Sequence, residues 1–190
     1  QKEQITLLIR IGALRFTGKS KAKLLWEVHM LLTNKRVVHI QSQLFTQQRK
    51  PFSLPAFEEK PLEAVYDEIE LLGFPVTLTF FELLQTRWRG SVHAGNLTAH
   101  VGDTVKMLGL LVTIKYVRTS KAEVMHFGCF IDEYGEFFDT VHFPDSLREY
   151  PFKGKGIYLL MGKVTSEFGH PAVEIIKMAR MPLQSNPKEA

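Results

Sequence analysis

The sequence predicts an α+β protein in which an N-terminal helical hairpin module is followed by a β-barrel of five strands. Two observations predict the barrel. Five short apolar segments with the patterning of strands lie between residues 101 and 183, separated by polar or glycine-bearing turns. A helical turn that begins at Pro144 separates the third segment from the fourth. Three strands, a short helix and two strands is the order of an OB-fold, a barrel that binds single-stranded nucleic acid or oligosaccharide.

The five expected strands span residues 105–116, 123–132, 136–143, 156–165 and 172–181. The first strand keeps Gly109 inside a long apolar run. A glycine in a strand interior indicates a bulge or a sharp bend, which a barrel needs where one strand serves two sheets. We therefore expect the first strand to bend at Gly109.

At the N-terminus, residues 1–32 are predicted to form two helices, over residues 4–14 and 24–32, joined by a basic turn. A helix, a glycine-bearing turn and a basic helix start resemble a helix-hairpin-helix, which holds a DNA phosphate against backbone N–H groups. Basic side chains there would add phosphate contacts that carry affinity but no sequence information. The alternative is a plain helical hairpin with a solvated basic loop. The residues expected to bind duplex DNA are Gly12, Arg15, Gly18, Lys19, Ser20, Lys21 and Lys23.

Positive charge is concentrated at the N-terminal end of the chain, although the formal net charge is only +4. Residues 1–50 hold ten Lys and Arg against two Glu, and residues 51–100 hold three basic against seven acidic residues. Residues 101–183 hold ten of each sign. This distribution suits an acidic polymer bound at the N-terminal end.

The segment between the hairpin and the barrel divides into two parts. Residues 33–60 lack periodicity and are predicted to be a polar linker, in which Leu44 and Phe45 form an isolated apolar pair shortly after Gln41. Such a pair either folds back onto its own protein or enters a pocket of another protein. Residues 61–100 are predicted to be connecting helices, at 61–72 and 79–87, and residues 184–190 a disordered tail.

Alternation along the second and third strands separates two sets of side chains. We expect one set to form the core: Met125, Phe127, Cys129, Ile131, Phe137, Val141 and Phe143. The other set then faces outward and offers flat side chains on which bases can stack. The alternative is that its phenylalanines are covered by the preceding helices, because aromatic residues are most often buried. The residues expected to bind single-stranded DNA are Lys115, Arg118, Lys121, His126, Phe130, Phe138 and His142.

The sequence carries no pattern of a catalytic or metal centre. It has no Walker loop and no nucleophile elbow, and alternation puts His126 and Cys129 on opposite faces of their strand. We expect no cofactor and no metal. A lone cysteine, Cys129, favours a reducing compartment, the cytoplasm, and no apolar run reaches membrane-spanning length. Because Gln1 already lies in a helical pattern, we expect a fragment of a longer protein.

Several stretches resemble the C-terminal part of the bacterial replicative DNA polymerase III alpha subunit. Residues 8–14, followed by Gly18-Lys19-Ser20, resemble the second hairpin of the tandem helix-hairpin-helix of this family. Residues 70–75, Glu-Leu-Leu-Gly-Phe-Pro, resemble the stretch that enters its OB domain. The similar motifs of the barrel are Thr119-x-Lys121-x-x-x-Met125-x-Phe127, Asp132-x-x-Gly135, Phe143-Pro144 and Gly162-Lys163-Val164.

The resemblance covers nearly the whole chain and implies the processivity portion of a replicative polymerase. It implies a hairpin that grips duplex DNA, a sliding-clamp peptide made by Gln41, Leu44 and Phe45, and an OB domain that approaches the single-stranded template beside other replisome subunits. The catalytic centre of this nucleotidyltransferase family lies upstream of Gln1. Arg15 stands where the family has an acidic residue, and Ser42 where the best clamp peptides have an apolar one. A freestanding OB-fold module for single-stranded DNA or RNA and a protein-interaction module are the alternatives.

Overall fold

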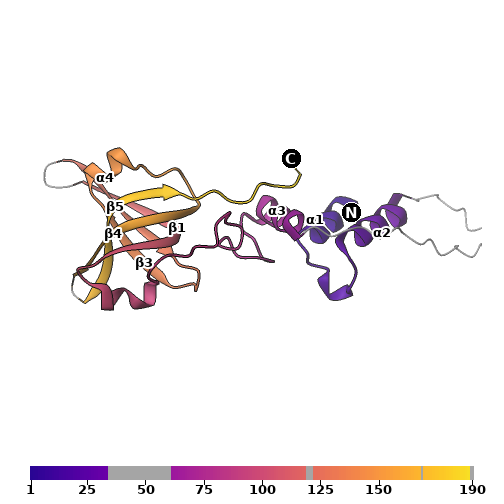
Figure 1. Cartoon of the computed structure of the whole chain (residues 1–190). Coiled ribbons are helices and arrows are strands. Elements are labelled where there is room, and N and C mark those ends of the chain that lie inside the picture. Colours follow the sequence, from indigo (N-terminus) through magenta and orange to yellow (C-terminus); the bar gives the residue numbers. More distant parts are fainter. Residues whose placement is uncertain (34–60, 119–121, 168, 189–190) are drawn as a thin grey trace, which may run out of the picture. The chain divides into compact units, whose positions relative to one another are not determined.

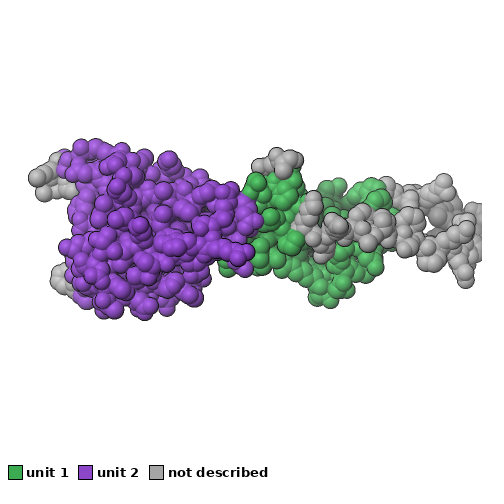
Figure 2. All heavy atoms as spheres, viewed as in Figure 1, with its two compact units in different colours: residues 1–79, 185–190 green, residues 80–184 purple. Residues whose placement is uncertain are grey.

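The structure is a computed structural model that describes residues 1–33, 61–118, 122–167 and 169–188 (Figure 1). The chain forms two compact units, residues 1–79 with 185–190 and residues 80–184 (Figure 2). We call them the helical unit and the barrel unit and describe each by itself. In the described ranges, no helix combines the length and the apolar character that crossing a membrane requires. The predicted clamp-binding residues Gln41, Leu44 and Phe45 and the predicted DNA contact Lys121 lie outside the described residues.

The helical unit contains α1 (Lys2–Arg10), the short 3-10 helix η1 (Arg15–Thr17), α2 (Lys21–Thr33) and α3 (Pro61–Leu72). Helix α1 packs against both α2 and α3, and Ile9, Leu24 and Val65 are buried. Helix α1 ends at Arg10, four residues earlier than predicted, because Gly12 adopts a left-handed conformation with φ +75°. At the start of α2, Ser20 Oγ accepts a hydrogen bond of 3.2 Å from Lys23 N, which caps the helix.

The barrel unit contains β1 (Thr104–Arg118), β2 (Val124–Ile131), β3 (Phe137–His142), the short helix α4 (Pro144–Glu149), β4 (Ile157–Glu167) and β5 (His170–Arg180) (Figure 1). The strands close into a barrel in the order β1-β2-β3-β5-β4. All neighbours are antiparallel except β3 and β5, which are parallel. This order, with a helix between β3 and β4, is that of an OB-fold and confirms the predicted α+β class.

Strand β1 serves both halves of the barrel. Residues 104–110 pair with β4 and residues 110–118 pair with β2, and the register shifts between Leu111 and Thr113. The bend was predicted at Gly109, but the register shift lies two to four residues further along the strand. A Cβ atom on Gly109 would lie 2.7 Å from Phe138 Cζ and 2.9 Å from Phe130 Cβ. Gly109 is required because two phenylalanine side chains pack directly on the backbone of β1.

The outside of β1 and β4 is covered by a separate apolar cluster. Phe81 and Leu84 pack against Leu108 and Ile157, and Leu84 forms an isolated β-bridge with Leu183. The helix predicted over residues 79–87 is not formed. Instead these residues make turns and an extended segment, because Phe81 and Leu84 are held by the outer wall of the barrel. The barrel unit consequently begins at Phe80, well before the predicted boundary at residue 101.

Candidate nucleic-acid interface

The barrel core contains the side chains that the sequence placed on the binding face. Phe130 is 0% exposed, Phe138 4% and His142 1%, and the two phenylalanine rings stack with their centroids 5.7 Å apart. The prediction that Phe130, Phe138 and His142 face outward is wrong. Alternation separates two faces of a strand but does not say which one is inside. Gly109 and Gly128, which leave room for Phe130 on two neighbouring strands, are the signal that could have identified the inner face.

The opposite face of β2 and β3 is partly exposed to solvent, although all of its residues except Asp139 were predicted to be the core. We define the outer β2–β3 face as the side chains that share this parity: Phe127, Cys129, Ile131, Phe137, Asp139 and Val141. Phe127 is 39% exposed and Phe137 65% exposed. Phe127 pairs across the ladder with Val141, and Phe137 pairs with Ile131. The structure thus presents two phenylalanine rings on one face of the barrel, separated by the Cys129–Asp139 pair.

One basic side chain, Lys115, lies beside this face, and other exposed cations are spread over the barrel unit. Lys115 on β1 lies directly opposite Phe127 in the ladder, and Arg118 ends the same strand. Both side chains are exposed. Among the residues that the structure describes, neither forms an ion pair, and the same holds for the other exposed cations Lys106, Lys153, Lys155, Lys163, Lys177 and Arg180. These charges are available to an anionic polymer.

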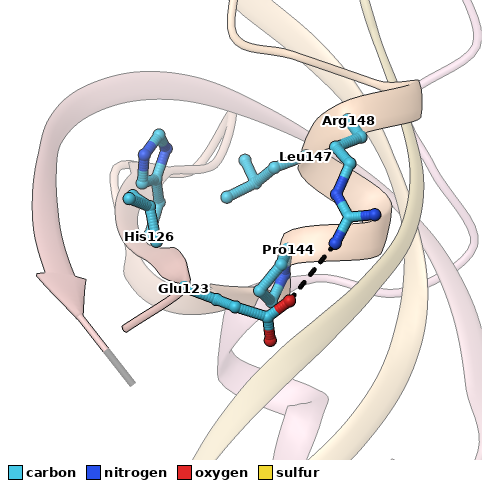
Figure 3. Close-up of a pocket in the computed structure, with 6 residues that line it drawn as sticks. Glu123, His126, Pro144, Leu147 and Arg148 are labelled. Atoms are coloured by element: carbon cyan, nitrogen blue, oxygen red, sulfur yellow. Dashed lines mark hydrogen bonds and ion pairs between the residues drawn. The ribbon is translucent and has the colours of Figure 1, made fainter. Parts of the chain in front are cut away.

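A hollow lies between the start of β2 and helix α4 (Figure 3). Its volume is about 350 Å³, and its lining residues are Glu123, Val124, His126, Pro144, Leu147 and Arg148. An Arg148 Nη2 atom lies 3.4 Å from Glu123 Oε1 across its rim. We call this hollow the α4 cavity. His126 and Leu147 border the same space in the close-up (Figure 3).

Three aromatic side chains form a row across the strands at this end of the barrel, from the exposed Tyr116 to the buried His142. Tyr116, His126 and His142 lie directly opposite one another on β1, β2 and β3. The His126 ring contacts Tyr116 edge to face, with centroids 4.5 Å apart, and stacks on Phe152 at 5.8 Å. His142 Nε2 lies 2.8 Å from Thr140 Oγ1. His126 Nδ1 is buried and has no hydrogen-bond partner in the described part of the chain.

The two histidines of this row are held neutral. Burial, and to a lesser degree repulsion from His126, lowers the pKa of His142 from 6.5 to about 4. Burial also lowers the pKa of His126. Neither imidazole therefore carries the charge that would attract a phosphate near neutral pH. The His126 ring already contacts Tyr116 and Phe152, and His142 is enclosed by the core.

The basic residues of the hairpin have partners within the helical unit. Arg15 pairs with the fully buried carboxylate of Glu68. Lys21 Nζ donates to the carbonyl oxygens of Arg10 at 2.6 Å and Ala64 at 3.4 Å.

Lys19 also has a partner, since its Nζ lies 2.7 Å from Glu27 Oε2, whereas Lys23 is exposed. Gly12 and Gly18 shape the turn with positive φ, and Ser20 caps α2. Arg15 and Lys21 hold α3 against the hairpin, a role that spacing along the hairpin did not indicate.

The described residues contain no group of three or more His, Cys, Asp or Glu side chains that could hold a metal ion. Asp132, one of the acidic residues near the β2–β3 turn, is buried and has a structural role. Its Oδ1 accepts hydrogen bonds from Tyr134 N at 2.9 Å and Glu136 N at 3.0 Å, and its Oδ2 accepts one from Ala94 N at 3.0 Å. Asp132 thereby fixes both the turn and the start of the 3-10 helix η3 (Ala94–His100).

No protein-family model and no curated protein matches the chain. A deletion mutant of the single-stranded DNA binding protein from Thermus aquaticus aligns at 16% identity over 46% of this chain and 44% of that chain, with a TM-score of 0.39. The N-terminal domain of the PriB protein from Thermoanaerobacter tencongensis aligns at 10% identity over 42% and 96%, with a TM-score of 0.35. The second OB-fold domain of replication protein A from Methanococcus maripaludis aligns at 10% identity over 42% and 85%, with a TM-score of 0.32. The chain spans less than half the length of the Thermus protein, and the strand order described above, rather than these distant likenesses, identifies the barrel as an OB-fold.

Proposed function

We propose that the barrel unit binds single-stranded nucleic acid, DNA or RNA, across the outer β2–β3 face. The observation that carries the proposal is the exposure of Phe127 and Phe137 on the two strands that OB-folds use for oligonucleotides. Each ring can stack one base, and stacking contributes about 1–3 kcal/mol per base without regard to sequence. Lys115 lies directly opposite Phe127 in the β1–β2 ladder and attracts the phosphate backbone.

The face is left bare by the way the rest of the unit packs. Residues 80–84 and 181–183 cover the outside of β1 and β4 with the cluster around Phe81 and Leu84. In the described residues no equivalent segment packs over Phe127 or Phe137, and both rings stay in contact with solvent. Exposed aromatic rings together with basic side chains are what single-strand binding requires.

Titration of the full chain with a labelled oligothymidine, as DNA and as RNA, tests this function. We expect Phe127→Ala and Phe137→Ala each to weaken binding about five- to a hundredfold, because each removes the stacking contact of one base. Phe74→Ala, which removes a ring that is 54% exposed in the helical unit, is the control and should leave the affinity unchanged. Affinity should also fall with salt, through counterion release. Wild-type affinity in the Phe127→Ala, Phe137→Ala double variant would exclude the outer β2–β3 face.

A second candidate is the wider role that the polymerase III alpha resemblance implies, in the cytoplasm and with a sliding clamp and replisome subunits as partners. The order of a helical hairpin before an OB-fold favours it. Its test is the peptide at Gln41, Leu44 and Phe45. Burying both apolar side chains in a clamp groove would gain roughly 1.5–3 kcal/mol each before ordering costs, so the lone peptide should bind weakly, around micromolar.

The combined change Leu44→Ala, Phe45→Ala should abolish clamp binding in a surface-plasmon assay with a bacterial sliding clamp. The melting temperature of the barrel unit should stay at the wild-type value. A variant that melts earlier and still binds the clamp would show that the pair folds back onto this chain instead.

A further inference from the structure

We infer that the barrel has a second contact surface for the bound strand, which binds the sugar-phosphate backbone after the strand leaves the outer β2–β3 face. This surface lies on the outside of β1, β4 and β5 and contains Lys106, Lys163 and Lys177. We call it the basic wall. The inference rests on the proposed single-strand function and adds to it the direction in which the strand runs around the barrel.

The three lysines point outward because their neighbours in sequence point into the barrel. These neighbours belong to the buried core: Val105 and Met107 beside Lys106, Val164 beside Lys163, and Met178 beside Lys177. Successive residues of a strand point to opposite faces of the sheet. The lysines therefore lie on the outer surface, where all three side chains are exposed.

The register of the sheet brings the three lysines together. Met161 on β4 lies directly opposite Lys106 on β1 and directly opposite Lys177 on β5. Neighbouring strands are about 4.8 Å apart, so the Cα atoms of these two lysines lie about 10 Å from each other across Met161. Lys163 follows Met161 two residues later on the same face of β4. Three positive charges are thus gathered on one part of the barrel surface.

The charge of the basic wall is open to an external anion. Among the residues that the structure describes, none of the three lysines forms an ion pair, although the half-buried Glu174 lies opposite Lys163 in the ladder. The apolar cluster on the outside of β1 reaches Leu108, and the exposed Lys106 stands two residues earlier on the same face. Lysine ammonium groups bind phosphates as point charges, so this surface suits the backbone of a nucleic acid rather than its bases.

The basic wall lies further around the barrel in the direction that the two exposed rings set. The closed barrel has the strand order β1-β2-β3-β5-β4, with Phe127 on β2 and Phe137 on β3. Val141 shares a strand and a face with Phe137, about 13 Å further along β3. Val141 pairs with Glu174 of β5, and Glu174 pairs with Lys163 of β4, about 10 Å around the barrel from β3. A strand that leaves the Phe137 ring therefore reaches Lys163 within roughly five nucleotides at 3.4 Å each.

The experiment measures how affinity and its salt dependence change with strand length. The full chain is titrated with labelled oligothymidines of about 4, 8 and 16 nucleotides, the range of OB-fold site sizes. On the shortest strand, which covers only the rings, Lys163→Gln with Lys177→Gln should behave as the wild type. On the longest strand, the slope of the logarithm of the binding constant against the logarithm of the salt concentration should fall by about 1.4, or two phosphate contacts. Lys153→Gln with Lys155→Gln removes the same charge from exposed positions before β4 and should match the wild type at every length.

Duplex DNA of about 16 base pairs is the second arm of the experiment. A duplex has a persistence length of about 150 base pairs, so it cannot follow the curved outside of the barrel as a single strand can. Its affinity should be the same for the wild type and for the variant of Lys163 and Lys177.

The outcomes separate this inference from the proposed function. A wild-type slope on the longest strand in the Lys163, Lys177 variant, while the Phe127→Ala, Phe137→Ala variant still loses affinity, overturns the basic wall and leaves the outer β2–β3 face intact. An equal loss on the shortest strand or on the duplex also overturns it. No binding of any strand counts against the proposed function and the basic wall together. In the wild-type chain the salt slope should become steeper with strand length, and a constant slope overturns the basic wall even if the variant fails to fold.

Discussion

His142 lies directly opposite His126 in the β2–β3 ladder, and its Nε2 lies 2.8 Å from Thr140 Oγ1. Burial, with repulsion from His126, lowers the pKa of His142 to about 4 in the folded state, whereas the unfolded chain titrates near 6.5. The unfolded state therefore takes up a proton first as the pH falls, and stability is lost between about pH 6.5 and 4. Between pH 7 and pH 5 the barrel unit should lose about 2 kcal/mol of unfolding free energy through this residue.

Urea denaturation at both pH values measures this loss. Trp88 is the single tryptophan of the barrel unit, so a Trp26→Phe background gives a fluorescence signal from that unit alone. His142→Gln keeps a side chain that can hydrogen-bond Thr140 but cannot titrate. Its unfolding free energy should be lower at pH 7 and change much less by pH 5. An equal pH dependence in the variant would assign the effect to other groups.

Phe130→Ala should destabilise the barrel unit by about 3–5 kcal/mol, because a fully buried ring is replaced by a cavity. Phe127→Ala removes the other phenylalanine of β2, whose ring is 39% exposed, and should cost about 1 kcal/mol or less. The Trp88 signal in urea measures both values. Comparable losses in the two variants would contradict the inner and outer assignment of β2.

Glu68→Gln should destabilise the helical unit by about 2–3 kcal/mol. The Glu68 carboxylate is fully buried and accepts hydrogen bonds from Val76 N at 2.7 Å and Thr77 N at 2.8 Å, besides its pair with Arg15. Burial alone would raise its pKa, but the hydrogen bonds from Thr77 and Val76 and the charge of Arg15 outweigh it and lower the pKa. The stability contributed by the carboxylate is present above its unfolded pKa and lost as the pH falls through the lowered folded value.

The control for this change is Glu70→Gln on the same helix. Its carboxylate pairs with Arg10 but is 62% exposed, so its loss should cost less than about 0.5 kcal/mol. Trp26 fluorescence in a Trp88→Phe background reports the helical unit. If Glu70→Gln costs as much as Glu68→Gln, burial is not the reason for the effect.

Duplex DNA binding by the hairpin is best tested at Lys19 and Lys23. Lys21 is bound to two backbone carbonyls, so its removal would disturb the fold as well as the charge. Changing Lys19 and Lys23 together to Gln should weaken binding to all duplex sequences. The slope of the logarithm of the binding constant against the logarithm of the salt concentration should fall by the amount expected for about two phosphate contacts. Lys106→Gln with Lys177→Gln on the barrel unit is the matched control. An unchanged salt slope in the hairpin variant would leave the hairpin as a structural element only.

The order of the barrel elements could be predicted from the sequence because its signals are local. Apolar runs, the turn at Gly135 and the proline that starts α4 each act on neighbouring residues, and their order specifies an OB-fold. The identity of the inner face was decided only by the tertiary structure. Phe130 and Phe127 are equally apolar, and period-two alternation treats the two faces of β2 alike.

Pairing of distant strands settled that choice. Gly109 of β1 and Gly128 of β2 leave room for the Phe130 ring, while no comparable space is made for Phe127. The hairpin shows the same limit. Whether Arg15 and Lys21 are free to meet DNA depends on Glu68 and Ala64 of α3, more than forty residues away along the chain. Hydrogen bonds and ion pairs between distant segments form only when the chain folds, so spacing within the hairpin could not reveal them.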